Sequence, residues 1–373
     1  MVKKVVLTAI FIKLVIFILI VIAFNLLPFS VNTYYANFHY PFNSRITLQT
    51  AFSTWDAQHY LFLGRYGYHP GLESDRFYPL LPGLIGILTP IFGAFFSGML
   101  FANVISIIGF VYFYLFVKEL TKNEKTAYLS FLLLISFPTA FYFSLIYSEA
   151  IFLGIIMPLF YYLYKRRFLL VFVLSVLLPL LRPTGIFILF PLFVFIVYDY
   201  LKDKKFSFKP STLLLLAPFI GFGLDLIVIY HSTGNFFTQF IGDASVVGGW
   251  SVGAIFHPNI FIQSLIPAHP AIHGFTNSII DRLFFVLFLV LLPLVFKKTD
   301  KVLFIYTLAM GIVPVFGSFM SYTRYLLLAF PIFIAMAVFF SAKKEKYVFP
   351  YFYISLLFQA LFIILHSLNY WVS

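Results

Sequence analysis

The 373-residue sequence contains no cysteine and few charged residues, which together make up 10% of the chain. Without cysteine, neither a disulfide framework nor a thiolate metal site can form. Polar stretches are also too short to build a separate soluble domain, so we expect residues 1–373 to form a single unit. The chain is instead 62% hydrophobic and 22% aromatic, far above the averages of soluble proteins. This composition predicts an all-α, polytopic integral membrane protein.

Eleven apolar segments approach the roughly 20 residues that a membrane-spanning helix needs. They lie at residues 5–28, 98–117, 126–144, 149–164, 168–181, 185–200, 211–230, 281–296, 301–317, 325–341 and 347–368. The first is interrupted only by Lys13 and has no small-residue cleavage pattern, so we expect a retained signal anchor. Segment 79–97 is also apolar, but Pro79, Pro82 and Pro90 should break its helix. We predict a re-entrant or juxtamembrane segment that does not cross.

The net charge of +12 is distributed in a regular pattern. Six basic clusters alternate with pairs of apolar spans, so all six fall on one face, which the positive-inside rule makes cytoplasmic. The clusters are Lys3-Lys4, Lys118 to Lys125, Lys165 to Arg167, Lys202 to Lys209, Lys297 to Lys301 and Lys343 to Lys346. The charge therefore indicates membrane topology, and we expect no nucleic-acid partner.

The opposite, non-cytoplasmic face has arginine but no lysine. Its basic residues are Arg45, Arg65, Arg76, Arg182, Arg282 and Arg324. A guanidinium binds pairs of phosphate or carboxylate oxygens and tolerates partial desolvation better than an ammonium. Arg45 and Arg282 also fit helix ends whose charge extends back to the membrane surface. For the others, an anionic ligand is an open alternative.

We predict two longer outer loops, at residues 29–78 and 231–280. The first contains Trp55-Asp56-Ala57-Gln58-His59-Tyr60, which places an acid beside aromatic residues at the mouth of a membrane bundle. Burial near Trp55 and Phe52 would raise the basicity of Asp56 and favour a general base. If this segment is helical, His59 lies one turn further on the same face. The second loop is rich in glycine and proline, and we interpret it as a possible lid.

Three acidic or titratable positions elsewhere allow two interpretations each. Glu149 begins a span at the outer face, where an acid also complements the helix dipole. Asp225 and His231 lie near the outer end of span 211–230, where ionisable residues usually face a cavity or a partner. A structural ion pair is the alternative. The sequence offers no close carboxylate pair, so we expect no metal and no cofactor.

These motifs resemble a known family. Trp55-Asp56-x-x-His59-Tyr60, Gly67-Tyr68 and Phe77-Tyr78-Pro79-Leu80-Leu81-Pro82 are similar to elements of the PIG-V-like mannosyltransferases, which add the second mannose of the glycosylphosphatidylinositol anchor, and of their prokaryotic relatives. Tyr147-Ser148-Glu149 resembles that family's Tyr-x-Glu element, Arg182-Pro183-Thr184-Gly185 its Arg-x-x-Gly element, and Arg324-Tyr325 its late Arg-Tyr pair. Arg76, where a small residue is usual, and Pro183-Thr184, where a polar pair is usual, leave the acceptor open.

The resemblance implies a GT-C-like bundle with an inverting, metal-independent glycosyltransferase site. A sugar, mannose by default, would move from a polyprenyl- or dolichyl-phosphate donor to a lipid-linked or envelope glycan acceptor on the non-cytoplasmic face. Asp56 would be catalytic, and Arg182 and Arg324 would neutralise the leaving phosphate. The further substrate-binding candidates are Trp55, His59, Tyr60, Asp75, Arg76, Glu149, Asp225, His231 and Tyr325.

The implied location is a prokaryotic plasma membrane with an outward-facing site, or the lumen of the endoplasmic reticulum in a eukaryote. Membrane lipids would surround the spans. A transporter or flippase for a lipid-linked anionic substrate is the alternative, because such proteins also carry outer arginines and broken spans. The Trp55 to Tyr60 motif around Asp56 favours the transferase. The two halves of the sequence show no matching pair of broken spans, which a transporter would be expected to have.

Overall fold

The computed structural model describes residues 1–203, 209–245, 258–267, 269–272, 274–316, 318–342 and 348–372. These residues form helices and turns, with one isolated bridge between Ala271 and Ser278 and no strand. In chain order, with η marking short 3-10 helices, they are α1 (Val2–Leu26), α2 (Val31–Ala36), α3 (Leu48–Ala51), α4 (Asp56–Tyr66), η1 (Glu73–Arg76), α5 (Leu80–Thr121), α6 (Glu124–Ile135), η2 (Ala140–Ser144), α7 (Ser148–Tyr164), α8 (Phe168–Leu177), η3 (Pro183–Ile188), α9 (Leu189–Asp203), η4 (Pro210–Leu216), α10 (Ala217–Thr233), α11 (Thr238–Ser245), α12 (Pro258–Leu265), α13 (Ile279–Lys298), α14 (Lys301–Ile312), η6 (Val313–Phe316), α15 (Tyr322–Leu326), α16 (Pro331–Ala342) and α17 (Val348–Ser367). The all-α prediction is confirmed for this part of the chain.

Six helical segments in the described ranges are long and apolar enough to cross a membrane. They are Val2–Leu26, Leu80–Thr121, Pro183–Lys202, Pro210–Thr233, Ile279–Lys298 and Val348–Ser367. Shorter apolar helices accompany them at Ser148–Tyr164, Phe168–Leu177, Lys301–Phe316 and Pro331–Ala342. These segments support a helical, membrane-embedded protein. Each of the eleven predicted spans overlaps a helix, whereas the number of spans that cross the bilayer stays a prediction.

Segment 79–97 agrees with its prediction only in part: it is helical from Leu80, and within the 42 residues of α5 a kink at Gly93 separates it from the helix that follows. That the segment does not cross the membrane stays a prediction. Pro79 is the residue before this helix, and Pro82 lies in the first turn, where proline interrupts no hydrogen bond. Pro90 lies inside the helix and is followed by a change of direction at Gly93, with φ 75° and ψ 158°. Glycine adopts such a conformation readily. The first two prolines therefore begin the helix and do not break it.

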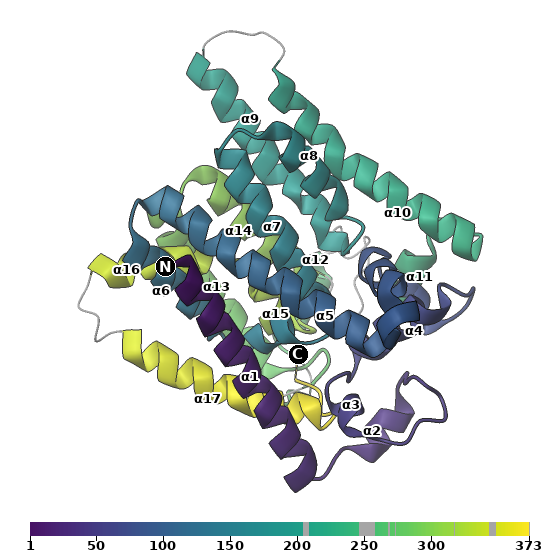
Figure 1. Ribbon diagram of the computed structural model, residues 1–373. Helices are drawn as coiled ribbons and strands as arrows, with labels where there is room; N and C mark the ends of the chain where they lie inside the picture. The colour runs from purple at the N-terminus through teal and green to yellow at the C-terminus, as the bar shows by residue number, and fades with distance from the viewer. Residues whose placement is uncertain are drawn as a thin grey trace.

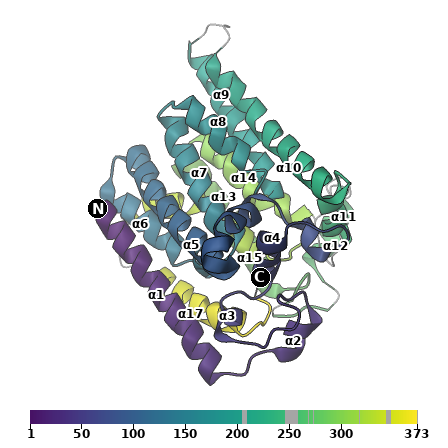
Figure 2. The same cartoon turned by 45° about the vertical axis from the view of Figure 1, so that its right-hand side comes forward.

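Helix α7 lies near the middle of the bundle and packs against α5 and α8 (Figure 1). Most of its side chains are buried. A Cβ atom added to Gly154 would lie 2.1 Å from Cγ2 of Ile105 in α5, so glycine is needed for this close approach. α8, α9 and α10 gather at one end of the molecule, while α1 and α17 lie side by side near the other (Figures 1 and 2). This packing places the beginning of α7, with Glu149, in the interior.

Lys13, which the sequence shows only as an interruption of the first span, is buried within the bundle. Its Nζ donates hydrogen bonds to the Phe143 carbonyl oxygen (2.6 Å), Ser106 Oγ (2.9 Å) and Asn103 Oδ1 (3.1 Å). These partners belong to α5 and η2. The buried ammonium therefore connects three elements through uncharged oxygens.

The first predicted outer loop contains α2, α3, α4 and η1, and this segment forms one wall of the site described below. The second loop contributes α11 and α12. Within this loop, residues 246–257, 268 and 273 lie outside the described residues. So does the Lys343 to Lys346 cluster and most of the Lys202 to Lys209 cluster.

Candidate active site

Asp56 is the first residue of α4, and the preceding Trp55 has an unusual backbone conformation. Trp55 has φ 56° and ψ −126°, a combination that bulky residues adopt rarely and that clusters at functional sites. Neighbouring elements hold this turn in place. Thr54 Oγ1 donates to the His366 carbonyl oxygen in α17 (3.0 Å), and Tyr147 OH donates to the Thr54 carbonyl oxygen (2.9 Å). The turn presents the Asp56 carboxylate at a helix N-terminus, where backbone N–H groups favour the ionised form.

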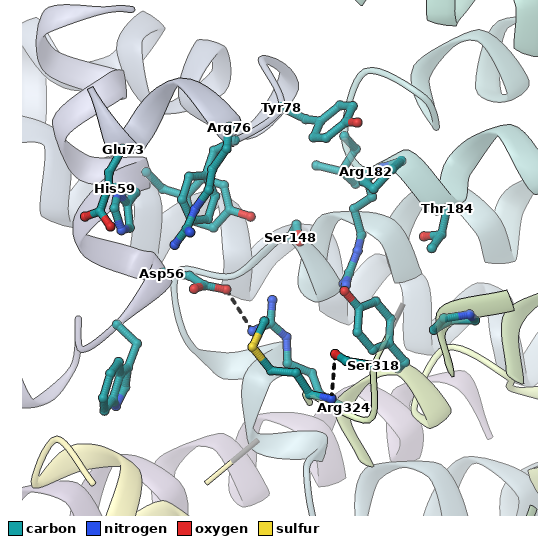
Figure 3. Close-up of a pocket in the computed structure, with 18 of the residues that line it drawn as sticks. Asp56, His59, Glu73, Arg76, Tyr78, Ser148, Arg182, Thr184, Ser318 and Arg324 are labelled. Atoms are coloured by element: carbon teal, nitrogen blue, oxygen red, sulfur yellow. Dashed lines mark hydrogen bonds and ion pairs between the residues drawn. The ribbon is translucent and has the colours of Figure 1, made fainter. Parts of the chain in front are cut away.

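Asp56, Glu149 and two arginines form a continuous ion-pair network. Arg324 Nη1, in α15, donates to Asp56 Oδ2 at 2.7 Å (Figure 3). Nε of the same arginine and Nη1 of Arg182 both donate to Glu149 Oε1. The Glu149 side chain is fully buried, whereas that of Asp56 is 22% exposed. Glu149 therefore fixes the two arginines, while Asp56 is the carboxylate of the network that a substrate can reach.

Aromatic rings complete the surroundings of both guanidinium groups. Arg324 lies 5.2 Å from the ring centroid of Tyr142 and 5.0 Å from that of Tyr147. Arg182 lies 5.1 Å from the ring of Tyr325. Such cation–π contacts are stronger when the partners are withdrawn from water. The rings therefore hold the arginine heads in fixed positions at the end of the ion-pair network.

The Arg182-Pro183-Thr184-Gly185 element has a steric explanation. Arg182 precedes η3 in an extended conformation, and Gly185 N–H donates to the Arg182 carbonyl oxygen at 3.0 Å. A Cβ atom added to Gly185 would lie 2.2 Å from the Leu178 carbonyl oxygen, so only glycine fits this tight turn. The turn directs the Arg182 side chain toward Glu149.

These residues surround a cavity of about 270 Å³. Arg76 and Arg182 are directed toward the same space as Asp56 and Arg324 (Figure 3). The cavity has polar, apolar and aromatic walls. The polar wall, which we call the arginine wall, includes Asp56, His59, Glu73, Arg76, Ser148, Arg182, Thr184 and Arg324. The apolar wall includes Leu181, Pro183, Phe187, Val313 and Pro314. The aromatic wall includes Trp55, Phe275 and Trp371. The cavity therefore suits a ligand with both charged and apolar parts.

The pKa of Asp56 is lowered from its usual value of 3.8. Burial alone would raise this pKa, but the charge of Arg324 and its hydrogen bond, with smaller contributions from Arg76 and Arg182, outweigh burial. The sequence-based expectation of a raised basicity is wrong in this state. The acid is ionised and weakly basic as long as Arg324 is bonded to it.

His59 lies one turn from Asp56 in α4 but is held between aromatic rings. Its ring centroid is 4.1 Å from that of Phe38 and 4.5 Å from that of Phe77, and Nδ1 lies 2.9 Å from Ser74 Oγ. Burial, reinforced by the charge of Arg76, lowers the pKa of His59 well below 6.5. His59 is therefore a neutral group of the cavity wall and does not offer a cation to a phosphate.

Arg76 differs from the other two arginines of the cavity. Among the described residues, its guanidinium has no bonded carboxylate and lies 5.2 Å from the Phe77 ring. Its backbone packs closely against α11, where a Cβ atom added to Gly242 would lie 3.0 Å from Arg76 Cβ. The exposed Glu73 lines the same cavity. Arg76 is thus the cation with the least compensated charge at the site.

The structure brings together most of the site residues proposed from the sequence. Those that line the cavity are Trp55, Asp56, His59, Tyr60, Arg76, Arg182, Arg324 and Tyr325. Glu149 does not reach the cavity and acts behind the arginines. Sequence reasoning missed Ser148, Thr184, Phe275 and Trp371. Trp371 had an available signal, because tryptophan occurs only three times in the chain and both tryptophans in the described ranges line this cavity.

Asp75, Asp225 and His231 lie elsewhere. Asp75 accepts hydrogen bonds from the backbone N–H groups of His69 (3.2 Å) and Leu72 (3.1 Å), so it shapes the turn before η1. Asp225 is buried in α10, where its Oδ1 lies 3.3 Å from Gln239 Nε2. His231 is exposed beside the ring of Tyr230. An Asp225–His231 pair is not formed, because residues six apart lie on different faces of a helix.

A comparison with protein-family models finds no match, and neither does a comparison with curated proteins.

Proposed function

We propose that the protein is a glycosyltransferase that moves a sugar, mannose by default, from a polyprenyl- or dolichyl-phosphate donor to a lipid-linked or envelope glycan. One observation carries this proposal: an ionised carboxylate and three arginines from separate elements surround a cavity that also has an apolar wall. Its volume of about 270 Å³ is close to the lower end of small-molecule sites, roughly 300–1,000 Å³. It suits the sugar-phosphate head of the donor.

The arginines are the groups that would bind the donor phosphate. Guanidinium groups match phosphate oxygens in pairs, and fixed cations stabilise charge that develops on a leaving group. Arg76, without a bonded carboxylate among the described residues, would meet the phosphate without first losing an ionic partner. Arg182 and Arg324 are positioned by Glu149, so their guanidinium groups are held at the cavity before the donor binds.

Asp56 is the group that would accept the proton of the acceptor hydroxyl. As this proton moves to the carboxylate, the hydroxyl oxygen forms a bond to the anomeric carbon of the donor. The bond between that carbon and the phosphate oxygen breaks, and its electron pair leaves with the phosphate. Attack opposite to the leaving group inverts the anomeric centre. The products are the extended glycan and the polyprenyl phosphate.

The ion pair between Asp56 and Arg324 would couple donor binding to this step. Arg324 Nη1 bonds to Asp56 Oδ2 at 2.7 Å, and phosphate oxygens would compete for the same guanidinium. When Arg324 turns to the phosphate, Asp56 loses the charge and the hydrogen bond that do most to offset burial, so the pKa of Asp56 rises relative to the resting protein. The base would therefore become stronger when the donor is in place.

The apolar wall is where the isoprenoid chain would leave the cavity. Leu181, Pro183, Phe187, Val313 and Pro314 form it, and they belong to η3, η6 and the turn before η3. The motifs similar to those of PIG-V-like enzymes surround the same cavity, which supports a GT-C-like bundle with this donor class. We place the site on the non-cytoplasmic face of a multi-pass protein, in a prokaryotic plasma membrane or the endoplasmic reticulum.

Orientation is tested by cysteine labelling, for which a chain without native cysteine is well suited. Glu73→Cys should react with a membrane-impermeant maleimide in intact cells, and Lys122→Cys should react only after permeabilisation. Glu73 lies in the predicted outer loop, and the Lys122 side chain is 72% exposed on the predicted cytoplasmic side. The reverse pattern would contradict the proposed orientation.

Activity is tested with radiolabelled polyprenyl-phosphate mannose, glucose and arabinose, added to membranes that contain the protein or its Asp56→Asn variant. We expect Asp56-dependent incorporation of one sugar into a lipid or polymer fraction, with and without EDTA. Restoration by magnesium after loss in EDTA would make Asp56 a metal ligand and not the base. Movement of an intact lipid-linked sugar across reconstituted vesicles, without transfer, would support a flippase in place of a transferase.

A further inference from the structure

The third wall of the cavity is built from aromatic residues that are far apart in the sequence. Trp371 lies 5.0 Å from Trp55, with its ring nearly perpendicular, and 4.3 Å from Phe275. Phe275 is 43% exposed, and all three residues line the cavity. We call these three residues the aromatic patch. It adjoins Asp56 directly, because Trp55 is the preceding residue in the chain.

A helix end directs Trp371 to this position. α17 ends at Ser367 and is followed by Asn369 at φ 62°, and the N–H groups of Tyr370 and Asn369 donate to the carbonyl oxygens of Leu365 (2.9 Å) and His366 (3.0 Å). These two bonds form a Schellman motif, which reverses the chain after a helix. The reversed segment is also fixed by the Ser30 N–H, which donates to the Leu368 carbonyl oxygen at 2.8 Å. Trp371 is therefore held at the cavity by defined backbone contacts.

The chemistry of the aromatic patch differs from that of the arginine wall. The face of an aromatic ring carries partial negative charge, so it disfavours phosphate and attracts the C–H groups of a neutral sugar ring. The indole N–H groups of Trp55 and Trp371 are buried and have no acceptor among the described residues, so the contacts that this wall offers a ligand come from its ring faces. A hydroxylated, uncharged ring matches these properties better than the anionic donor head does.

We propose that Trp55, Phe275 and Trp371 form the acceptor subsite, which holds one neutral sugar ring of the acceptor glycan so that a hydroxyl faces Asp56. This inference rests on the proposed glycosyltransferase function. The donor phosphate occupies the arginine wall, and the acceptor sugar occupies the aromatic patch. Asp56 lies between them, which is where a base must be to take the proton of the attacking hydroxyl.

The test measures binding to the detergent-solubilised full-length protein. Saturation-transfer NMR follows methyl α-D-mannopyranoside, methyl glucopyranoside and methyl arabinofuranoside, and a separate equilibrium assay follows sugar-free undecaprenyl phosphate. Trp371→Ala should weaken binding of the preferred glycoside by about tenfold or more, the loss expected for one well-packed aromatic contact. Undecaprenyl phosphate binding should be unchanged. In the wild type, the strongest transfer should reach C–H protons on one face of the sugar ring.

Tyr370→Ala is the matched control, because Tyr370 is 41% exposed and adjacent in sequence but does not line the cavity. It should change neither binding event. Phe275→Ala provides the same test if Trp371→Ala does not fold. The proposal is overturned if no glycoside binds the wild type, or if the aromatic variants keep glycoside binding. Loss of undecaprenyl phosphate binding in these variants would also overturn it, by assigning the patch to the lipid.

The transfer assay separates this inference from the function on which it rests. With an active enzyme, Trp371→Ala should raise the KM for the acceptor and leave the KM for the donor unchanged. If the wild type transfers no sugar but binds a glycoside through Trp371, the subsite stands and the transferase proposal fails. If transfer occurs and Trp371→Ala alters only the donor KM, the function stands and the subsite fails.

Discussion

Among the described residues, the buried cations form two clusters that differ in their bonded partners. In the first, Lys13 donates to carbonyl, hydroxyl and amide oxygens, with no bonded carboxylate among the described residues. In the second, Arg182 and Arg324 bond to Glu149, and Arg324 also bonds to Asp56. Both clusters connect several helices. Only the arginine cluster faces the cavity.

The difference shows which features of a buried cation indicate function. The oxygens bonded to Lys13 belong to the packed elements themselves, and Lys13 does not line the cavity, so the Lys13 cluster is suited to holding helices together. A carboxylate that is itself accessible can exchange partners with a phosphate. Burial of a positive charge is therefore only a weak indicator of a functional site. A cavity beside an accessible ion pair is a stronger indicator of such a site. Mutation should therefore affect the arginine cluster much more than the Lys13 cluster.

Asp56→Asn should have the largest effect on the arginine cluster. The amide keeps the shape of the acid but cannot accept the proton, so transfer should fall by roughly a hundred- to ten-thousandfold, the range of general-base catalysis. The loss should appear in kcat, with the donor KM little changed. The radiolabel assay with purified protein measures both constants. Retention of more than about a tenth of the wild-type rate is incompatible with a general base of this strength.

Glu149→Gln should mainly affect stability. The glutamine oxygen can still accept a hydrogen bond, but Arg182 loses its charged partner, and removal of one member of a buried ion pair costs about 3–5 kcal/mol. Arg324 keeps its bond to Asp56, which limits the damage. Thermal unfolding in detergent should show a clearly lowered Tm. An unchanged Tm would mean that the arginines find other partners and that Glu149 does not organise the site.

Lys13→Met is the matched change in the other cluster, and we expect a small effect. Methionine fills the space of the lysine stem, and replacing a buried charge with an apolar side chain of similar volume is often neutral or stabilising. The Phe143 carbonyl oxygen keeps a donor, because Ser106 Oγ also bonds to it at 2.8 Å. Stability should change by less than about 1 kcal/mol, with transfer near the wild-type rate. A loss as large as that of Glu149→Gln would remove the distinction between the clusters.

The sequence predicted the helices well, because long apolar segments have few other ways to satisfy their backbone in a membrane. Its main error in the fold was the expected effect of Pro79 and Pro82, which begin the helix of segment 79–97 and do not break it. Proline is a helix breaker only inside a helix, and the position of Pro79 and Pro82 at its start could not be known before α5 was seen. The position of the kink at Gly93 could not be predicted from the sequence for the same reason, because it lies inside this helix.

The site was predicted less completely, because its energetics depend on contacts across the chain. The motif around Asp56 indicated a reactive acid, but the sign of its pKa shift is set by Arg324, which is 268 positions away. Glu149 could not be recognised as a bridge between two arginines from its own neighbourhood. Trp371 reaches the cavity only through the turn that follows α17. Local sequence therefore identified the reactive groups but not their partners.

The pH dependence of transfer should be the smallest effect, and it tests the Asp56–Arg324 pair directly. The pKa of Asp56 is lowered from 3.8 because the positive charges of Arg324, Arg76 and Arg182 outweigh burial. A lowered pKa keeps the carboxylate ionised at every pH above this value, and its contribution to stability is lost only as the pH falls through the lowered value. The profile of kcat/KM, which reports the free enzyme, should therefore show no acid limb from this group between about pH 5 and 8. His59, whose pKa is also lowered, should add none. An acid limb near pH 6 that disappears in Asp56→Asn would show that burial, and not Arg324, controls the acid in the resting protein.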